Sequence, residues 1–411
     1  MSSPRSEQSQ RYRVLTAQTI YAPEEISGPS SIVFAGSKIH AIWRHADAKT
    51  ARQRWRDEQL DPSVEFIDLG PLRLAPGYID LHDHGFHGHD ITTGSREDIE
   101  TMAAELPRTG TTAFFPTIAT TGRDETAQQV RRCVEAAESQ PSASAEILGI
   151  RLEGPFISIA KKGAQYEPAI RKPDPEEMRE LARIGGGWIR MVDYAPEEDA
   201  DDQLLNALTE LGILPCIGHT NATYEEAVRA IDGGARHCTH LFNAMSPLEH
   251  RAPGAPGALL TDRRTTVEII ADGIHLNPAI LKLVVDARGV DTTALITDAV
   301  SAAGLPDGVY EFIKRKVIVS DGAVRLENGT IAGSALTLDR AVRNMVTLAG
   351  CSWQNAIHMA TLTPARIAGV DDRKGRLIPG ADADALALDS DGIVQQAWTR
   401  GQDAYQRAPG G

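Results

Sequence analysis

Four of the twelve histidines in this chain lie within residues 80–89, which read DLHDHGFHGH. His82 and His84 are separated by one residue at the end of an apolar run, and a β-strand places such side chains on the same face. Both imidazoles therefore point toward one position in space, as the ligands of a metal ion must. Taken alone, this motif also fits a polar loop that contains unrelated histidines.

Residues of the same chemical kind end four other short apolar runs: Glu153, His219, His240 and Asp298. Any one of them could be an ordinary polar residue at a strand end. Six such residues at equivalent positions, however, predict an active site that is built around metal and therefore a metal-dependent hydrolase. Imidazole and carboxylate ligands in this ratio suit zinc, iron, manganese or cobalt rather than magnesium or calcium.

A second group of polar residues follows His240 along the chain. Asn243 offers both a donor and an acceptor, and the planar fork of Arg251 suits a phosphate or a carboxylate. His275 adds an imidazole at the end of another predicted strand. The alternative interpretation of Arg251 is an ordinary surface arginine. No glycine-rich phosphate loop accompanies these residues, so a nucleoside triphosphate is not expected.

The elements that must position these side chains alternate between short apolar runs and stretches of helical period. We predict eight strands over residues 75–81, 112–117, 147–152, 188–192, 213–217, 237–242, 267–270 and 294–297. Helices are predicted between them, over residues 96–106, 125–138, 175–184, 202–211 and 224–231. Thr223 and Glu226 fit a capping box at the start of the last of these. This alternation is typical of a (β/α)₈ TIM-type barrel, whose catalytic residues lie at the carboxyl ends of the strands.

The segments on either side of the barrel have the character of short strands. Residues 13–15, 31–34 and 38–43 precede it, and residues 376–378, 385–388 and 393–394 follow it, after helices over 336–348 and 353–359. We therefore predict a small β-sandwich domain from residues 12–73 and 365–408, with the barrel over residues 74–364. The charged run over residues 47–61 is predicted to be a solvated helix or loop.

The composition indicates which partners the protein can bind and in which cellular compartment it acts. The net charge of −14 repels phosphate backbones and argues against nucleic acid. No apolar run is long enough to cross a bilayer, and the polar first residues contain no export signal. The four cysteines, none in CxxC spacing, are typical of reduced thiols. We expect a cytoplasmic enzyme that acts on a small molecule, without membrane or nucleic acid.

Several motifs, in this order, resemble those of the amidohydrolase superfamily and, more narrowly, of its N-acetylglucosamine-6-phosphate deacetylases. These motifs are GIRLEGPF, CIGHTNAT, HLFNAMSP, IADGIH and LITDA. The resemblance extends from about residue 74 to residue 379. It implies a deacetylase that hydrolyses the acetamide of N-acetylglucosamine 6-phosphate, or of a closely related N-acetylhexosamine 6-phosphate.

The resemblance also implies roles for individual residues. Glu153, His219 and His240 match metal ligands found throughout the family, and His82 and His84 match the additional pair of its two-metal members. Two divalent ions, zinc foremost, are thus implied, with Glu153 as the bridge. Asp298 matches both a ligand and the catalytic aspartate. The implied substrate contacts are Asn243, the backbone of Ala244, Arg251 and His275. In relatives the arginine can come from the neighbouring subunit, so a homodimer is implied.

Two residues depart from the family pattern. Gln165 stands at a substrate-facing position where some relatives carry a histidine that polarises the acetyl carbonyl, so that role must pass to the second metal or weaken. Asp193 is acidic where apolar or hydroxyl side chains are more usual, and the sequence offers no function for it. Two alternatives stay open: a cyclic-amide hydrolase or deaminase of the same superfamily, and a non-catalytic, assembly-forming relative.

Overall fold

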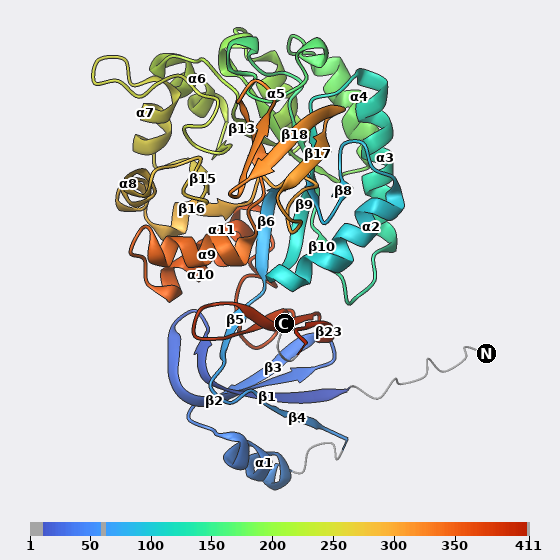
Figure 1. Ribbon diagram of the computed structural model, residues 1–411, viewed down its shortest axis with the longest axis vertical. Coiled ribbons are helices and arrows are strands. Elements are labelled where there is room, and N and C mark those ends of the chain that lie inside the picture. Colours follow the sequence, from blue (N-terminus) through green and yellow to red (C-terminus); the bar gives the residue numbers. More distant parts are fainter. Residues whose placement is uncertain (1–10, 59–62, 409–411) are drawn as a thin grey trace, which may run out of the picture.

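The computed structural model describes residues 11–58 and 63–408, so the predicted polar N-terminal segment lies mostly outside the described residues. The chain forms a (β/α)₈ barrel and a separate sheet made from its two terminal segments (Figure 1). The predicted fold class is therefore confirmed. Among the described residues, no helix is long and apolar enough to cross a membrane.

The barrel strands run parallel, and each predicted strand is present in some form. In spatial order they are β6 (Tyr78–Asp83), β9 (Thr111–Ala119), the interrupted strand β10 (Glu146–Ile147) and β11 (Ile150–Glu153), β12 (Ile189–Tyr194), β13 (Leu214–Ile217), β14 (His237–Cys238), β15 (Thr266–Ile270) and β16 (Thr293–Ile296). The last strand returns to the first, because the Asp298 N–H donates to the His82 carbonyl at 2.9 Å. The His84 N–H donates to the Ala299 carbonyl at the same distance.

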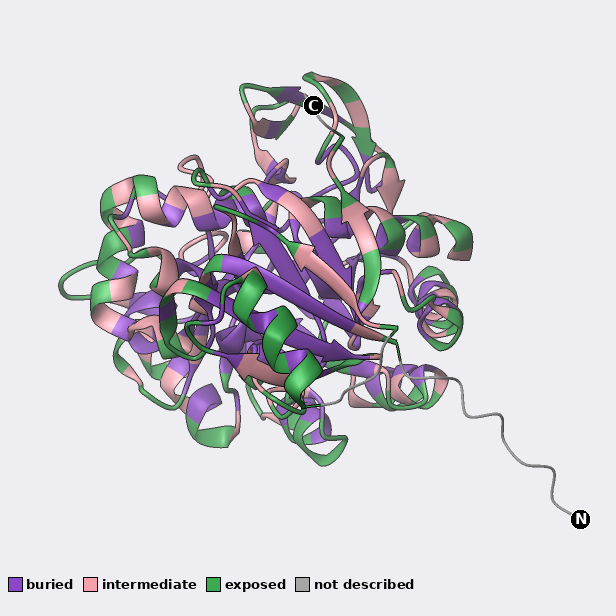
Figure 2. Cartoon of the chain, turned by 90° about the horizontal axis from the view of Figure 1, so that it is seen from below, coloured by how far each residue is buried: buried purple, intermediate pink, exposed green. Residues whose placement is uncertain are grey.

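Helices surround these strands and bury apolar residues against them. They are α2 (Arg96–Glu105), α3 (Arg123–Ser139), α4 (Pro175–Gly185), α5 (Gln203–Glu210), α6 (Tyr224–Gly233), α7 (Gly254–Thr261), α8 (Pro278–Arg288), α9 (Leu338–Thr347), α10 (Trp353–Ala360) and α11 (Leu362–Ile367). The predicted capping box of α6 is present, with the Glu226 N–H donating to the Thr223 hydroxyl at 3.2 Å. Figure 2 shows the burial, with purple strands inside and green residues on the outer helices.

The terminal segments form one eight-stranded sheet. Its strands are β1 (Tyr12–Tyr21), β2 (Glu25–Ala35), β3 (Lys38–Trp43), β4 (Glu65–Asp68), β5 (Arg73–Pro76), β21 (Ala385–Leu388), β22 (Val394–Thr399) and β23 (Gln402–Gln406). The two ends of the chain join where β21 pairs antiparallel with β5. Helix α1 (Ala48–Asp57) packs on this sheet, burying Trp55 against it, so the charged run is in part a helix.

Three predictions of local structure need correction, and one sheet was not predicted. The predicted strand over residues 75–81 is divided at Gly77 into β5 and β6, which enter different sheets. A Cβ at Gly77 would lie 2.0 Å from the Thr112 hydroxyl oxygen, so glycine permits the close approach of β9 there. The strand over 237–242 ends at Cys238. Residues 376–378 form no strand. Residues 308–334 form an antiparallel sheet that was not predicted, described next.

This additional sheet, which we call the flap, lies across the barrel in Figure 1. It comprises β17 (Gly308–Phe312), β18 (Arg315–Ser320), β19 (Ala323–Leu326) and β20 (Ile331–Ser334). Its buried residues include Phe312, Val317 and Val324, which pack against Val300 beyond the last barrel strand. The flap therefore forms one wall above the carboxyl ends of the barrel strands.

Candidate active site

The six residues predicted to bind metal converge at the carboxyl ends of the barrel strands. They form two groups that share Glu153: one with His82, His84 and Asp298, and one with His219 and His240. In each group the potential ligand atoms lie within 4.8 Å of one another, and all of these residues are buried. The prediction that these six side chains meet is thus matched by their positions, although their roles stay predictions.

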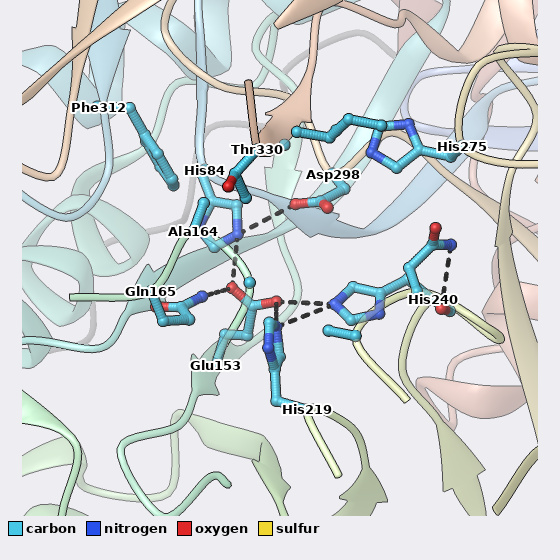
Figure 3. Close-up of a pocket in the computed structure, with 15 residues that line it drawn as sticks. His84, Glu153, Ala164, Gln165, His219, His240, His275, Asp298, Phe312 and Thr330 are labelled. Carbon is cyan, nitrogen blue, oxygen red and sulfur yellow. Dashed lines mark hydrogen bonds and ion pairs between the residues drawn. The ribbon is translucent and has the colours of Figure 1, made fainter. Parts of the chain in front are cut away.

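Glu153 stands between the two groups (Figure 3). Its Oε1 lies 3.0 Å from His219 Nε2 and 3.1 Å from His240 Nε2, and its Oε2 lies 3.1 Å from His84 Nε2. Asp298 Oδ1 lies 3.3 Å from His84 Nε2 and 3.5 Å from His82 Nε2. One carboxylate therefore faces both histidine pairs, which is the arrangement that a bridging ligand requires.

The donor atoms fit divalent cations. Within each pair the Nε2 atoms face each other, at 3.1 Å for His82 and His84 and at 3.2 Å for His219 and His240. The outer nitrogens of His84 and His219 lie 3.0 Å and 2.9 Å from the carbonyl oxygens of Thr117 and Lys161. A carbonyl oxygen that accepts a hydrogen bond from Nδ1 keeps the ring hydrogen on that nitrogen, so the Nε2 lone pair is free to bind a metal.

Electrostatics also favour positive charge here. Burial would raise the pKa of Glu153, but the charges of His82, His219 and His84 lower it well below its usual range. Burial and Arg151 lower the pKa of His82, whereas Glu153 and Asp298 outweigh them and raise it to about 9. The two carboxylates thus hold their negative charges and attract cationic groups or ions.

The backbone is strained where it presents several of these side chains. His219, His240 and Asp298 have φ angles of 47°, 27° and 49°, in the left-handed region that residues with a Cβ rarely adopt. Such conformations persist where surrounding structure over-determines them, commonly at functional sites. At Gly218 a Cβ would lie 2.6 Å from the Thr239 Cβ, so glycine permits the close approach that precedes the His219 turn.

A cavity of about 270 Å³ opens above the candidate metal centre. Of the predicted substrate contacts, Gln165, Asn243, Ala244 and His275 line it. Arg251 does not line it and is exposed in a loop. The flap contributes residues that were not predicted: Phe312, Thr330, Ile331 and Gly333. Nothing in the local sequence indicated them, because whether these residues reach the cavity depends on how the flap folds back over the barrel.

Two of the lining residues are held by neighbours. The Gln165 side chain accepts the Thr120 N–H at 2.8 Å and donates its amide N–H to Glu153 Oε2. His275 Nδ1 lies 2.6 Å from Asp272 Oδ2. Burial would raise the pKa of Asp272, but the hydrogen bond from His275 lowers it, so this carboxylate stays ionised and orients the ring.

The comparisons with known proteins agree with this fold and this site. The amidohydrolase family model matches residues 73–404, and the chain belongs to that family. It is a metal-dependent hydrolase. The N-acetylglucosamine-6-phosphate deacetylase of Bacillus subtilis is 40% identical over 81% of this chain and 84% of its own.

Two further relatives bear on the substrate. The N-acetylgalactosamine-6-phosphate deacetylase of Escherichia coli O157:H7 is 38% identical over 80% of this chain and 87% of its own. A mutant N-acetyl-D-glucosamine-6-phosphate deacetylase from Mycobacterium smegmatis, solved with N-acetyl-D-glucosamine-6-phosphate, superposes with a TM-score of 0.87. That structure is 32% identical and covers 96% of this chain and all of its own.

Proposed function

We propose that this enzyme hydrolyses the acetamide of N-acetylglucosamine 6-phosphate, or of its galactosamine epimer, to acetate and the amino-sugar phosphate. The observation that carries the proposal is the cavity in which the shared Glu153, Asp298 and the polar residues Asn243 and His275 face one space. One similar protein is an N-acetylglucosamine-6-phosphate deacetylase and another is an N-acetylgalactosamine-6-phosphate deacetylase, which is why we keep both epimers as candidate substrates.

We propose two divalent cations, zinc foremost, with iron, manganese or cobalt as alternatives. Glu153 would be shared, with His82, His84 and Asp298 on one side and His219 and His240 on the other. When bound, such cations supply a water activated near neutral pH and stabilise charge on the attacked carbonyl. The encoded Glu153 also argues against the cyclic-amide hydrolases and deaminases whose metals share a modified lysine.

Asp298 is proposed to move the proton. Its buried carboxylate lines the cavity and lies 3.3 Å from His84, so it is held in place beside the reacting groups. It accepts a proton as water adds to the acetyl carbon, and it returns this proton to the nitrogen as the C–N bond breaks. The products are acetate and a free amine.

The phosphate is proposed to bind to Asn243, His275 and Arg251, with the backbone of Ala244 beside them. Asn243 and His275 line the cavity, whereas Arg251 is exposed in a loop and does not line this cavity in its own chain. We therefore propose a homodimer in which Arg251 completes the site of the partner subunit. A phosphate recognised by an arginine fork gains charge-assisted hydrogen bonds worth about 1.5–3 kcal/mol each.

The decisive experiment compares kcat/KM of the zinc-loaded enzyme on both N-acetylhexosamine 6-phosphates and on plain N-acetylglucosamine. We expect a preference for the phosphorylated sugar of roughly 10²-fold or more, from the bonds just described. Arg251→Ala should remove most of that preference and leave the slow reaction on the uncharged sugar nearly unchanged. Equal rates on phosphorylated and plain sugar would contradict the substrate assignment.

The location of the enzyme is also a proposal. The described cysteines Cys133, Cys216, Cys238 and Cys351 are free thiols, and three of them are buried. Reduced thiols are typical of the cytoplasm, which is where we propose that the protein acts. A fractionation in which the enzyme followed an exported marker would contradict this.

A further inference from the structure

A cluster of charged and polar side chains is buried inside the barrel beneath the metal ligands. It consists of Arg151, Asp193, His237, Thr239 and Glu268, each 0% exposed. Burying charged groups costs several kcal/mol per ion unless each group is paired and hydrogen-bonded. A cluster of this kind in place of an apolar barrel core therefore calls for an explanation.

Arg151 lies at the centre of the cluster and uses all three of its nitrogens. Nε and Nη2 donate to Asp193, with Nη2 3.0 Å from Oδ1, and Nη2 also donates to the Thr239 hydroxyl at 3.0 Å. Nη1 donates to the Leu81 carbonyl at 3.0 Å and to Glu268 Oε1 at 2.5 Å. The guanidinium thus holds two carboxylates in fixed positions, one on each side.

Glu268 is the member of the cluster that reaches the metal ligands. Its Oε1 also lies 2.8 Å from His237 Nε2, so this oxygen is held from two sides. Its Oε2 accepts the main-chain N–H of His240 at 3.3 Å and lies 3.6 Å from His82 Nδ1. That nitrogen is buried and has no hydrogen-bond partner among the described residues.

We propose that Glu268 is a positioning residue of the metal centre, which orients His82 through its Nδ1 and His240 through its backbone N–H. One residue would thereby set a ligand in each of the two groups. The proposal rests on the metal centre of the proposed function and adds residues to it. It also accounts for Asp193, which accepts hydrogen bonds from Nε and Nη2 of Arg151 while Nη1 bonds Glu268.

The physical reason lies in the two nitrogens of one imidazole. A ring that binds metal through Nε2 carries its hydrogen on Nδ1, and a carboxylate facing that hydrogen fixes the ring and makes Nε2 a stronger ligand. Loss of such a partner commonly weakens metal binding by about 10–100-fold. Arg151 and His237 keep the carboxylate from turning away from His82.

The test compares Glu268→Gln with Asp193→Asn. Each variant removes the negative charge of one carboxylate that pairs with Arg151. Of these two carboxylates, Glu268 is the one whose side chain approaches His82 and His240. Metal affinity would be measured by titrating Zn²⁺ against a chromophoric chelator, with elemental analysis for stoichiometry. We expect Glu268→Gln to bind Zn²⁺ about 10–100-fold more weakly at one site or both. Asp193→Asn should bind nearly as the wild type does, although both variants melt at lower temperature.

Three results separate the possibilities. Wild-type affinity in Glu268→Gln, or an equal loss in both variants, would overturn the positioning role. Failure of the wild type to bind any divalent metal would instead overturn the proposed function. Should Glu268→Gln not fold, Glu268→Asp decides, since it keeps the charge beside Arg151 but withdraws the oxygen from His82. Weaker Zn²⁺ binding by this variant is expected, and unchanged binding contradicts the proposal.

Discussion

Asp298 shows how one carboxylate can serve two purposes at the scale of a residue. Its left-handed backbone conformation and its contacts with His82 and His84 hold it at the floor of the cavity. Because its position is set by these neighbours, a change of its chemistry need not change its place. Its proton-transfer role can therefore be tested with an isosteric amide.

We expect Asp298→Asn to lower kcat by roughly 10²–10⁴-fold, the usual contribution of general acid–base catalysis. KM should change much less, since the sugar phosphate is bound by other residues. The acidic limb of the pH–rate profile should disappear. Steady-state kinetics between pH 5 and pH 9 measure all three quantities, and a variant with near-normal kcat and an unchanged profile would mean that another group is the base.

Glu153 is the residue on which both metal groups depend. Its two oxygens face different histidine pairs, so no other described ligand can replace it without a rearrangement. Glu153→Ala should therefore release at least one metal ion per chain, because the remaining ligands are too few. Elemental analysis of wild type and variant, purified side by side, measures the loss. Undiminished metal in the variant would remove Glu153 from the site.

At the scale of elements, the proposed metal ligands lie at or just after the carboxyl ends of the barrel strands. A loop that carries such a ligand can end where a capped helix begins. The segment after β13 illustrates this, because His219 has a left-handed conformation and Thr223, four residues later, is the N-cap of α6. The Thr223 hydroxyl accepts the Glu226 N–H, and Glu226 Oε2 accepts the Thr223 N–H at 2.8 Å. The cap thus fixes where the ligand loop must end.

Thr223→Ala should lower the free energy of unfolding by about 1 kcal/mol, within the usual range of about 0.5–2 kcal/mol for the loss of an N-cap. Thr223→Ser keeps the hydroxyl and is the matched control, with a stability close to that of the wild type. Urea unfolding followed by circular dichroism measures both. Equal stability of the alanine and serine variants would show that the cap contributes nothing.

At the scale of the whole molecule, the terminal sheet is tied to the barrel by a buried ion cluster. Lys374 is almost fully buried, and its Nζ lies 2.8 Å from Glu146 on β10 and 2.5 Å from Asp384 beside β21. Asp382 lies 3.2 Å away and also pairs with the half-exposed Lys38 at 2.7 Å. Lys374 therefore balances carboxylates from both parts of the chain.

Lys374→Met should destabilise the protein by about 3–5 kcal/mol at pH 7, since it removes the only cation that pairs with the buried Asp384 among the described residues. Lys38→Met is the matched control, with a loss of no more than about 1 kcal/mol, because Lys38 is half exposed. Urea unfolding of the two variants measures the difference. Similar losses in both would mean that the buried lysine has no special role.

The pH dependence of this cluster follows from Asp382. Burial raises the pKa of this carboxyl, but the charge of Lys374 and the hydrogen bonds from Lys38 and Arg373 lower it to about 2. A carboxyl with a lowered folded pKa stabilises the protein above its unfolded pKa of about 3.9, and this contribution is lost as pH falls toward 2. The difference in the free energy of unfolding between wild type and Lys374→Met should therefore become smaller when urea unfolding is repeated below pH 4.

The division of the chain at residues 73/74 and 364/365 stays a prediction. Strands β5 and β6 are consecutive along the chain but enter different sheets, so the first boundary should lie near the residues between them. Limited proteolysis with mass spectrometry of the fragments would locate the boundaries.

The sequence by itself determined the elements and the residues that end them. Apolar runs and helical periods are local signals, so eight strands and the cap at Thr223 could be predicted from neighbouring residues alone. The period of two in a strand likewise predicted that His82 and His84 face the same way. Because the carboxyl ends of parallel barrel strands meet at one mouth, the convergence of the six ligand-type residues followed from their positions in the sequence.

Only the tertiary structure decided what depends on contacts between distant segments. Arg151 meets Asp193 and Glu268 across 42 and 117 positions, and no local pattern records such a pairing. The flap lines the cavity, whereas Arg251 does not. Both facts depend on how the loops pack over the barrel, which no local sequence pattern records. The charges of Asp193 and Glu268 were visible in the sequence, but their meaning depended on the buried arginine between them.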